Sequence, residues 1–159
     1  MRARVALAVA SLLAGSVFAG PAQSQSGYAV LPVQSLRFGT LTPGLPTAVS
    51  SADGGRRAAI EVSGRGLVTV RFSLPGSMRS GTGALLPLQF GPADGQVMNV
   101  SNGQVTVFDP RQEHRFTVGG SAGRAVVYLG GTAQPAIGQA PGSYEGEITV
   151  TVTISSGNT

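Results

Sequence analysis

Few side chains in this chain of 159 residues could take part in catalysis. His114 is the only histidine, and the absence of cysteine and lysine excludes thiol, zinc–thiolate and Schiff-base chemistry. The stretch Gly119–Gly123 fits the pattern G-x-S-x-G, with Ser121 as a possible nucleophile and His114 as its base. That pattern indicates a nucleophilic serine only where it forms the sharp turn between a strand and a helix. A strand-like run follows here, so a glycine-rich turn is the better interpretation.

Acidic residues beside the histidine raise the question of a metal site. Asp109, Glu113 and His114 carry possible ligand atoms, but their spacing matches no metal-binding loop. Arg111 and Arg115 place opposing charge next to them. We interpret the segment as a charged, solvated turn. The sequence therefore predicts no catalytic residues, no metal and no cofactor, and a protein that is not an enzyme.

The first 24 residues have the layout of a secretory signal peptide. Arg2 and Arg4 precede an apolar run from Val5 to Phe18, which is too short to span a bilayer and leads into small residues. We predict a cleaved leader over residues 1–24, with cleavage within about five residues of that boundary. A single domain over residues 25–159 would remain, located in the periplasm, at the cell surface or outside the cell.

The charge of the chain argues against a nucleic-acid partner. The formal net charge is +4, and removal of Arg2 and Arg4 lowers it to +2. Arg56 and Arg57 form the only adjacent basic pair, so no basic cluster is available to contact phosphates. We expect contact with the membrane only during export.

Short strand-like runs separated by glycine and proline predict an all-β domain. The 24 glycines and 10 prolines interrupt the chain at intervals typical of a β-sandwich or barrel. The candidate strands include RAAIEVSG, the alternating run Val68–Leu74, ALLPLQF, HRFTV and RAVVYLGG. No helical period of ten or more residues follows the leader.

One hairpin can be given a register. Asn102-Gly103 is a strong two-residue turn signal, and it predicts pairing of Ser101 with Gln104. In that register Val100 meets Val105, Asn99 meets Thr106, and Met98 meets Val107. The apolar residues of both strands then share one face, and Asn99, Ser101, Gln104 and Thr106 share the other.

The segment PGSYEGEITVTVTIS has the longest period-two run of the chain. Ile148, Val150, Val152 and Ile154 share one face of the predicted strand, which must be buried. Tyr144 stands at the start of this strand, where we expect its hydroxyl to tie down the preceding turn rather than to stack on a ligand.

Three segments together resemble a known family. They are LRFGTLTPG (Leu36–Gly44), IEVSGRGLVTVRFSLP (Ile60–Pro75) and the closing segment Val127–Ser155, with a G-x-Y-x-G motif before its last strand. This order resembles small secreted bacterial β-sandwich proteins known only as a domain of unknown function. That family is similar to spore-coat-protein-U-like proteins and to chaperone–usher pilin subunits. The resemblance implies an immunoglobulin-like (pilin-like) antiparallel β-sandwich.

The pilin-like resemblance also implies how such a domain could assemble. In those proteins the sandwich lacks its last strand, and a strand from a periplasmic chaperone or a neighbouring subunit fills the groove. Ile148, Val150, Val152 and Ile154 would line that groove here. The donor strand, or a strand that completes the same domain, would contain Tyr28, Val30, Leu31 and Val33.

Two hypotheses for the function stay open at this point. In the first, the protein is an exported fibre or coat subunit that is assembled by strand complementation with like subunits and a chaperone. In the second, it is a self-contained secreted or periplasmic binding or scaffold module. Only about 11 residues separate Ser24 from Leu36, and Pro32 interrupts them. This short extension favours the second hypothesis, because a donor strand needs several paired residues and a linker.

Overall fold

The computed structural model describes residues 2–9, 28–119 and 123–155, and within these ranges it contains strands and no helix. The all-β prediction is therefore confirmed. In chain order the strands are β1 (Arg2–Val9), β2 (Ala29–Gln34), β3 (Leu36–Thr40), β4 (Thr47–Val49), β5 (Ala58–Ser63), β6 (Gly66–Ser73), β7 (Ser77–Ser80), β8 (Leu85–Gln89), β9 (Gly95–Asn99), β10 (Val105–Phe108), β11 (His114–Val118), β12 (Arg124–Leu129), β13 (Gly131–Ala133) and β14 (Ser143–Ser155).

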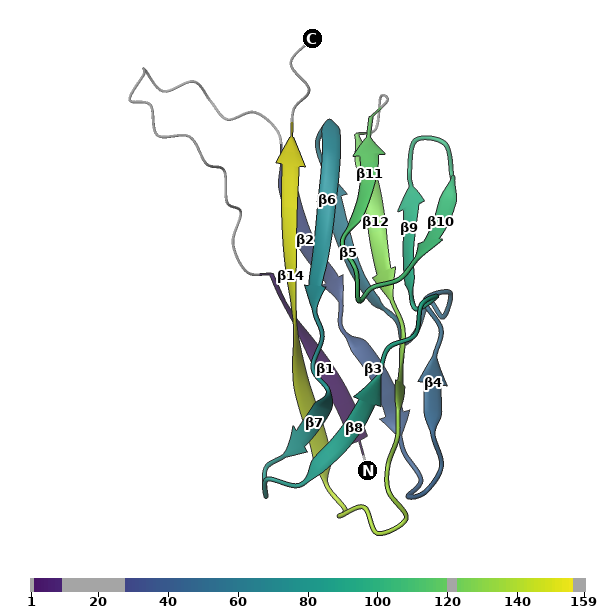
Figure 1. Cartoon of the computed structure of the whole chain (residues 1–159), viewed down its shortest axis with the longest axis vertical. Coiled ribbons are helices and arrows are strands. Elements are labelled where there is room, and N and C mark those ends of the chain that lie inside the picture. Colours follow the sequence, from purple (N-terminus) through teal and green to yellow (C-terminus); the bar gives the residue numbers. More distant parts are fainter. Residues whose placement is uncertain (1, 10–27, 120–122, 156–159) are drawn as a thin grey trace, which may run out of the picture.

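The strands form two sheets that face each other as a sandwich (Figure 1). The smaller sheet has five strands in the order β10-β9-β12-β5-β2. The larger sheet has nine strands, with the path β11-β6-β14-β7-β8-β13-β4, and β1 joins β14 to β3. Among the described ladders only the one between β1 and β14 is parallel.

At two of the places where the chain passes from one sheet to the other, a single residue makes the connection. Ser35 alone separates β2 in the smaller sheet from β3 in the larger one, and the Gln34 side chain fixes this crossing by donating to the carbonyl of Arg57 at 2.7 Å. Gly130 alone separates β12 from β13. A Cβ atom at Gly130 would overlap the Val49 carbonyl oxygen, so only glycine fits this second crossing.

The core consists of the alternate side chains that point between the sheets. On β6 the buried residues are Val68, Val70 and Phe72, as the alternation of that run predicts. On β14 they include Ile148 and Val150, both at 0% exposure. Antiparallel pairing of β14 with β6 places these two apolar rows side by side in one sheet.

The predicted register of the hairpin around Gly103 is wrong by two residues. Val105 pairs with Met98 rather than with Val100, and Asn99 closes the loop against Gln104. The cause lies in the neighbouring strand and loop, because the Val100 amide donates to the carbonyl of Arg124. A shift of two preserves side-chain parity. The predicted faces of the paired residues are therefore correct, although the pairs are not.

Tyr144 has the structural role that its position predicts. Its side chain is fully buried, and its hydroxyl donates to the carbonyl of Ala140 at 2.7 Å. The same hydroxyl accepts from the amide of Gln139 at 2.8 Å. The turn that leads into β14 is thus tied to the core through one phenol oxygen.

Removal of this hydroxyl tests the role of the turn. We expect Tyr144→Phe to lower the free energy of unfolding by about 1–3 kcal/mol, because it leaves buried polar partners without their hydrogen bond. Tyr28→Phe is the matched control, since its hydroxyl bonds to the Arg65 carbonyl at an exposed site. Urea denaturation of both variants measures the difference, and equal effects would contradict the assignment.

Candidate functional site

The two edges of β14 have different partners. Along one edge, Thr149–Ser155 pairs with β6, and Tyr144 and Glu145 pair with β7. Because β7 follows β6 directly in the chain and continues its direction along β14, these two strands occupy the same edge. The opposite edge of Ser143–Val150 pairs with β1. Figure 1 shows β1 beside the lower half of β14.

Strand β1 also pairs with β3 on its other side. This second ladder is antiparallel and runs from the pair Arg2–Thr40 to the pair Val5–Leu36, with one register shift. Among the described residues, β3 has no other ladder partner. A single strand therefore fills a gap between β3 and β14, which we call the β3–β14 gap.

The register of β1 defines what the β3–β14 gap accepts. Leu7 is the ladder partner of Ile148, and Val5 is the partner of Leu36. Ile148 and Leu36 are both at 0% exposure. In the sequence, Ala3 and Val9 stand at the same parity as Val5 and Leu7, so these alternate ladder positions of β1 all carry apolar residues. The gap thus matches a strand with apolar residues at every second position.

The four residues predicted to line a groove share one face of β14, but they differ in their neighbours. Ile148 and Val150 are ladder partners of β1, whereas Val152 and Ile154 lie beyond its last pair and face β6 alone. Ile148, Val150 and Val152 are buried, and Ile154 is half-buried. The prediction of one buried face on this strand is confirmed.

The segment predicted as donor or self-complementing strand does not lie beside β14. Val30 and Leu31 belong to β2 and pair with Val62 and Glu61 of β5 in their own domain. Val33 is 62% exposed at the outer edge of this sheet. The crossing at Gln34 directs this segment into the smaller sheet, away from Ile148–Ile154. The neighbour of β14 is instead β1, within the stretch predicted as a leader.

Sequence reasoning missed this role of β1, although a signal was present. Ala3, Val5, Leu7 and Val9 form an apolar row, while Arg2 and Arg4 stand on the other parity. The same residues also match the basic start and apolar run of a signal peptide. Because the signal-peptide pattern already accounts for these residues, they are predicted as a leader and not as a strand.

The sequence matches the model of one known protein family. The family model of DUF4402, a domain of unknown function, matches residues 29–153. The chain belongs to this family. No curated protein matches the chain. The match covers β2 to β14 and leaves β1 outside the DUF4402 domain, so the strand that fills the β3–β14 gap is not part of the family's common unit.

Several charged groups of this DUF4402 domain form ion pairs with a residue two or three positions away in the chain. Asp109 accepts from Arg111 at 2.7 Å, which holds the pKa of Asp109 below its ordinary value. Glu113 bonds to Arg115 at 2.9 Å. The described residues contain no group of three or more potential metal ligands, and Ser121 lies outside them. They also contain no helix long and apolar enough to cross a membrane.

His114 packs in the sandwich rather than facing a nucleophile among the described residues. Its ring stacks on Phe108 with centroids 4.2 Å apart and planes 6° apart. Burial lowers the pKa of His114 below the ordinary histidine value of 6.5. The charged imidazolium is therefore less favourable in the folded protein than in the unfolded chain.

This shift predicts how stability depends on pH. Because the unfolded chain binds the proton more readily, the contribution of His114 is complete above pH 6.5 and is lost as the pH falls below that value. His114→Phe should flatten the stability curve between about pH 6.5 and 5, where carboxylates stay ionised. Thermal unfolding at a series of pH values measures this, and an unchanged slope would contradict the assignment.

Proposed function

We propose that this DUF4402 protein is an exported structural subunit of a surface fibre or coat, assembled by β-strand complementation and without catalytic activity. One observation carries the proposal. The strand that fills the β3–β14 gap comes from residues with the layout of a secretory leader, and it lies outside the DUF4402 unit. Export that removes residues 1–24 would remove this strand.

Loss of β1 leaves unpaired backbone on two strands at once. Ser143–Val150 would lose one full edge, and β3 would lose its ladder partner among the described residues. Unpaired edges beside buried side chains such as Leu36 and Ile148 readily accept another strand. A strand that enters the gap pairs on both of its sides, so it gains two ladders rather than one.

The partner must supply an extended segment with apolar residues at alternate positions. We also propose, from the sequence resemblance to spore-coat-protein-U-like and pilin-like proteins, that a periplasmic chaperone supplies this segment first and a like subunit afterwards. Donation of Tyr28–Val33 by another copy would require the ladder between β2 and β5 to open in that copy. We therefore propose that the incoming strand comes from a segment other than β2.

A second candidate function is a self-contained secreted or periplasmic binding or scaffold module. The observation that favours it is the pairing of β2 with β5, which completes the smaller sheet within one chain. This alternative requires that the β3–β14 gap closes without β1, by direct pairing of β3 with β14. Once residues 1–24 are removed, the β3–β14 gap is therefore open in the first candidate and closed in the second.

A peptide experiment separates these candidates. We expect a chain that begins at Gln25 to associate with itself, and to be less stable than the full chain by roughly 3 kcal/mol or more, because Leu36 and Ile148 become partly exposed. A synthetic peptide with the sequence Arg2–Val9 should bind this chain and restore a monomer. Gel filtration and thermal unfolding measure both effects.

The matched control is the same peptide with Leu7→Asp, which places a charge beside Ile148. It should neither bind nor restore the monomer. A stable monomer of the chain from Gln25 that ignores both peptides would reject complementation and favour the self-contained module.

A further inference from the structure

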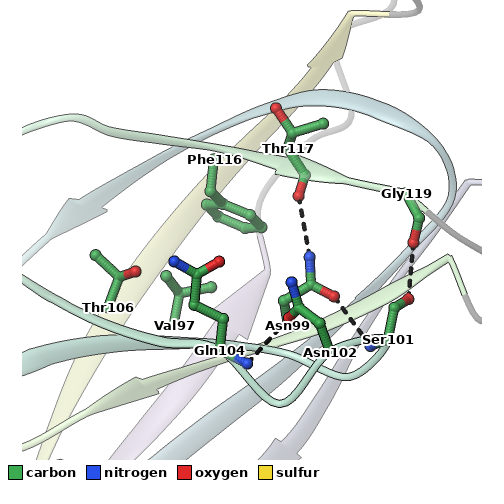
Figure 2. A pocket seen from close by; sticks show the side chains of 9 residues that line it. All are labelled: Val97, Asn99, Ser101, Asn102, Gln104, Thr106, Phe116, Thr117 and Gly119. Atoms are coloured by element: carbon green, nitrogen blue, oxygen red, sulfur yellow. Dashed lines mark hydrogen bonds between the residues drawn. The ribbon is translucent and has the colours of Figure 1, made fainter.

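A second surface feature lies away from the β3–β14 gap. A cleft of about 450 Å³ opens between the hairpin of β9 and β10 and strand β11, which belong to different sheets (Figure 2). In Figure 1 this end of the sandwich is at the top, whereas β1 lies in the lower half. The volume falls within the range of roughly 300–1,000 Å³ that is usual for small-molecule sites.

Hydrogen bonds between the sheets hold the walls of this cleft in place. The Asn99 side chain donates to the carbonyl of Thr117 at 3.4 Å, and its oxygen accepts from the amide of Ser101 at 3.0 Å. The Ser101 hydroxyl donates to the carbonyl of Gly119 at 2.8 Å. The bonds to Thr117 and Gly119 join the two walls, as Figure 2 shows, so the cleft is preformed rather than a gap between loose loops.

Several polar groups on the walls have no partner among the described residues. The side-chain amide of Gln104 and the hydroxyl of Thr106 line the cleft and make no hydrogen bond within the described part of the chain. The Asn102 side chain uses its oxygen to accept from the Gln104 backbone at 3.0 Å, which leaves its two N–H donors available. Together these groups offer both donors and acceptors.

The cleft also has an apolar side and no charge. Phe116 is half-buried and lines it, and Val97 is buried at its floor. Figure 2 shows the Phe116 ring on the side toward which the Gln104 side chain extends. None of the residues that line the cleft is ionisable. The surface therefore suits a ligand that has several hydroxyl groups, one apolar face and no charge.

We propose that this cleft binds a neutral pyranose sugar. The amides and hydroxyls match neighbouring sugar hydroxyls, because each presents donors and acceptors without a charge. The Phe116 ring matches the apolar C–H face of a pyranose. A charged sugar would lose its solvation here without gaining an ion pair. This site is independent of the proposed strand complementation, since β1, β3 and β14 contribute none of its lining residues.

The test is a titration of the purified full chain, followed by ¹H–¹⁵N NMR. The probes are the methyl glycosides of glucose, galactose and mannose, and N-acetylglucosamine, with methyl glucuronide as the charged comparison. We expect at least one neutral probe to shift the amides of residues 97–106 and 116–119 at millimolar concentration. The glucuronide should bind more weakly. Absence of shifts with every neutral probe, or shifts confined to other parts of the chain, would overturn the proposal.

Two exposed glutamines supply matched variants. Gln104→Ala should weaken binding of the responding sugar by about fivefold, which corresponds to loss of one amide hydrogen bond. Gln112→Ala, at an exposed site outside the cleft, should leave binding unchanged. Both variants should keep the dispersed spectrum of the folded chain. Equal affinity of the Gln104→Ala variant and the original chain would contradict a role for the cleft.

Discussion

The strand β14 extends over 13 residues of the larger sheet, and its backbone needs hydrogen-bond partners along both edges. Strands β6 and β7 satisfy one edge from within the DUF4402 unit. The other edge depends on β1, a strand that lies before that unit in the chain. The place of β3 in the larger sheet follows from this pairing, because among the described residues β3 is joined to β14 only through β1.

The crossing between β2 and β3 explains why the domain cannot close this edge with its own first strand. The chain leaves the smaller sheet at Gln34 and enters the larger one at Leu36. Gln34 is held to the carbonyl of Arg57, so β2 stays against β5. Only five residues of β3 then reach the larger sheet, and a strand's width separates them from β14. The same crossing that builds the sandwich thus creates the β3–β14 gap.

The sequence predicted local structure well and partner choice poorly. Period-two alternation correctly indicated β6 and β14, because one buried face imposes that pattern directly. Alternation does not say which strand lies alongside, so it leaves open whether the segment Tyr28–Val33 lies beside β14. In the structure Ala29–Gln34 pairs with β5 of the same chain instead. The hairpin at Gly103 was misregistered because a contact from Val100 to Arg124, distant in sequence, overrode the preference of the turn. The cleft could not be predicted either, since it depends on which sheets meet at that end.

Hydrogen–deuterium exchange over Gly146–Ile148 tests the central claim most directly, because among the described residues these three have ladder partners only in β1. The comparison is between the full chain and the chain that begins at Gln25, with and without the peptide Arg2–Val9. We predict slow exchange in the full chain, fast exchange in the shortened chain, and slow exchange again when the peptide is added. Slow exchange in the isolated shortened monomer would contradict the account, since it would mean that β14 finds a second partner within its own domain.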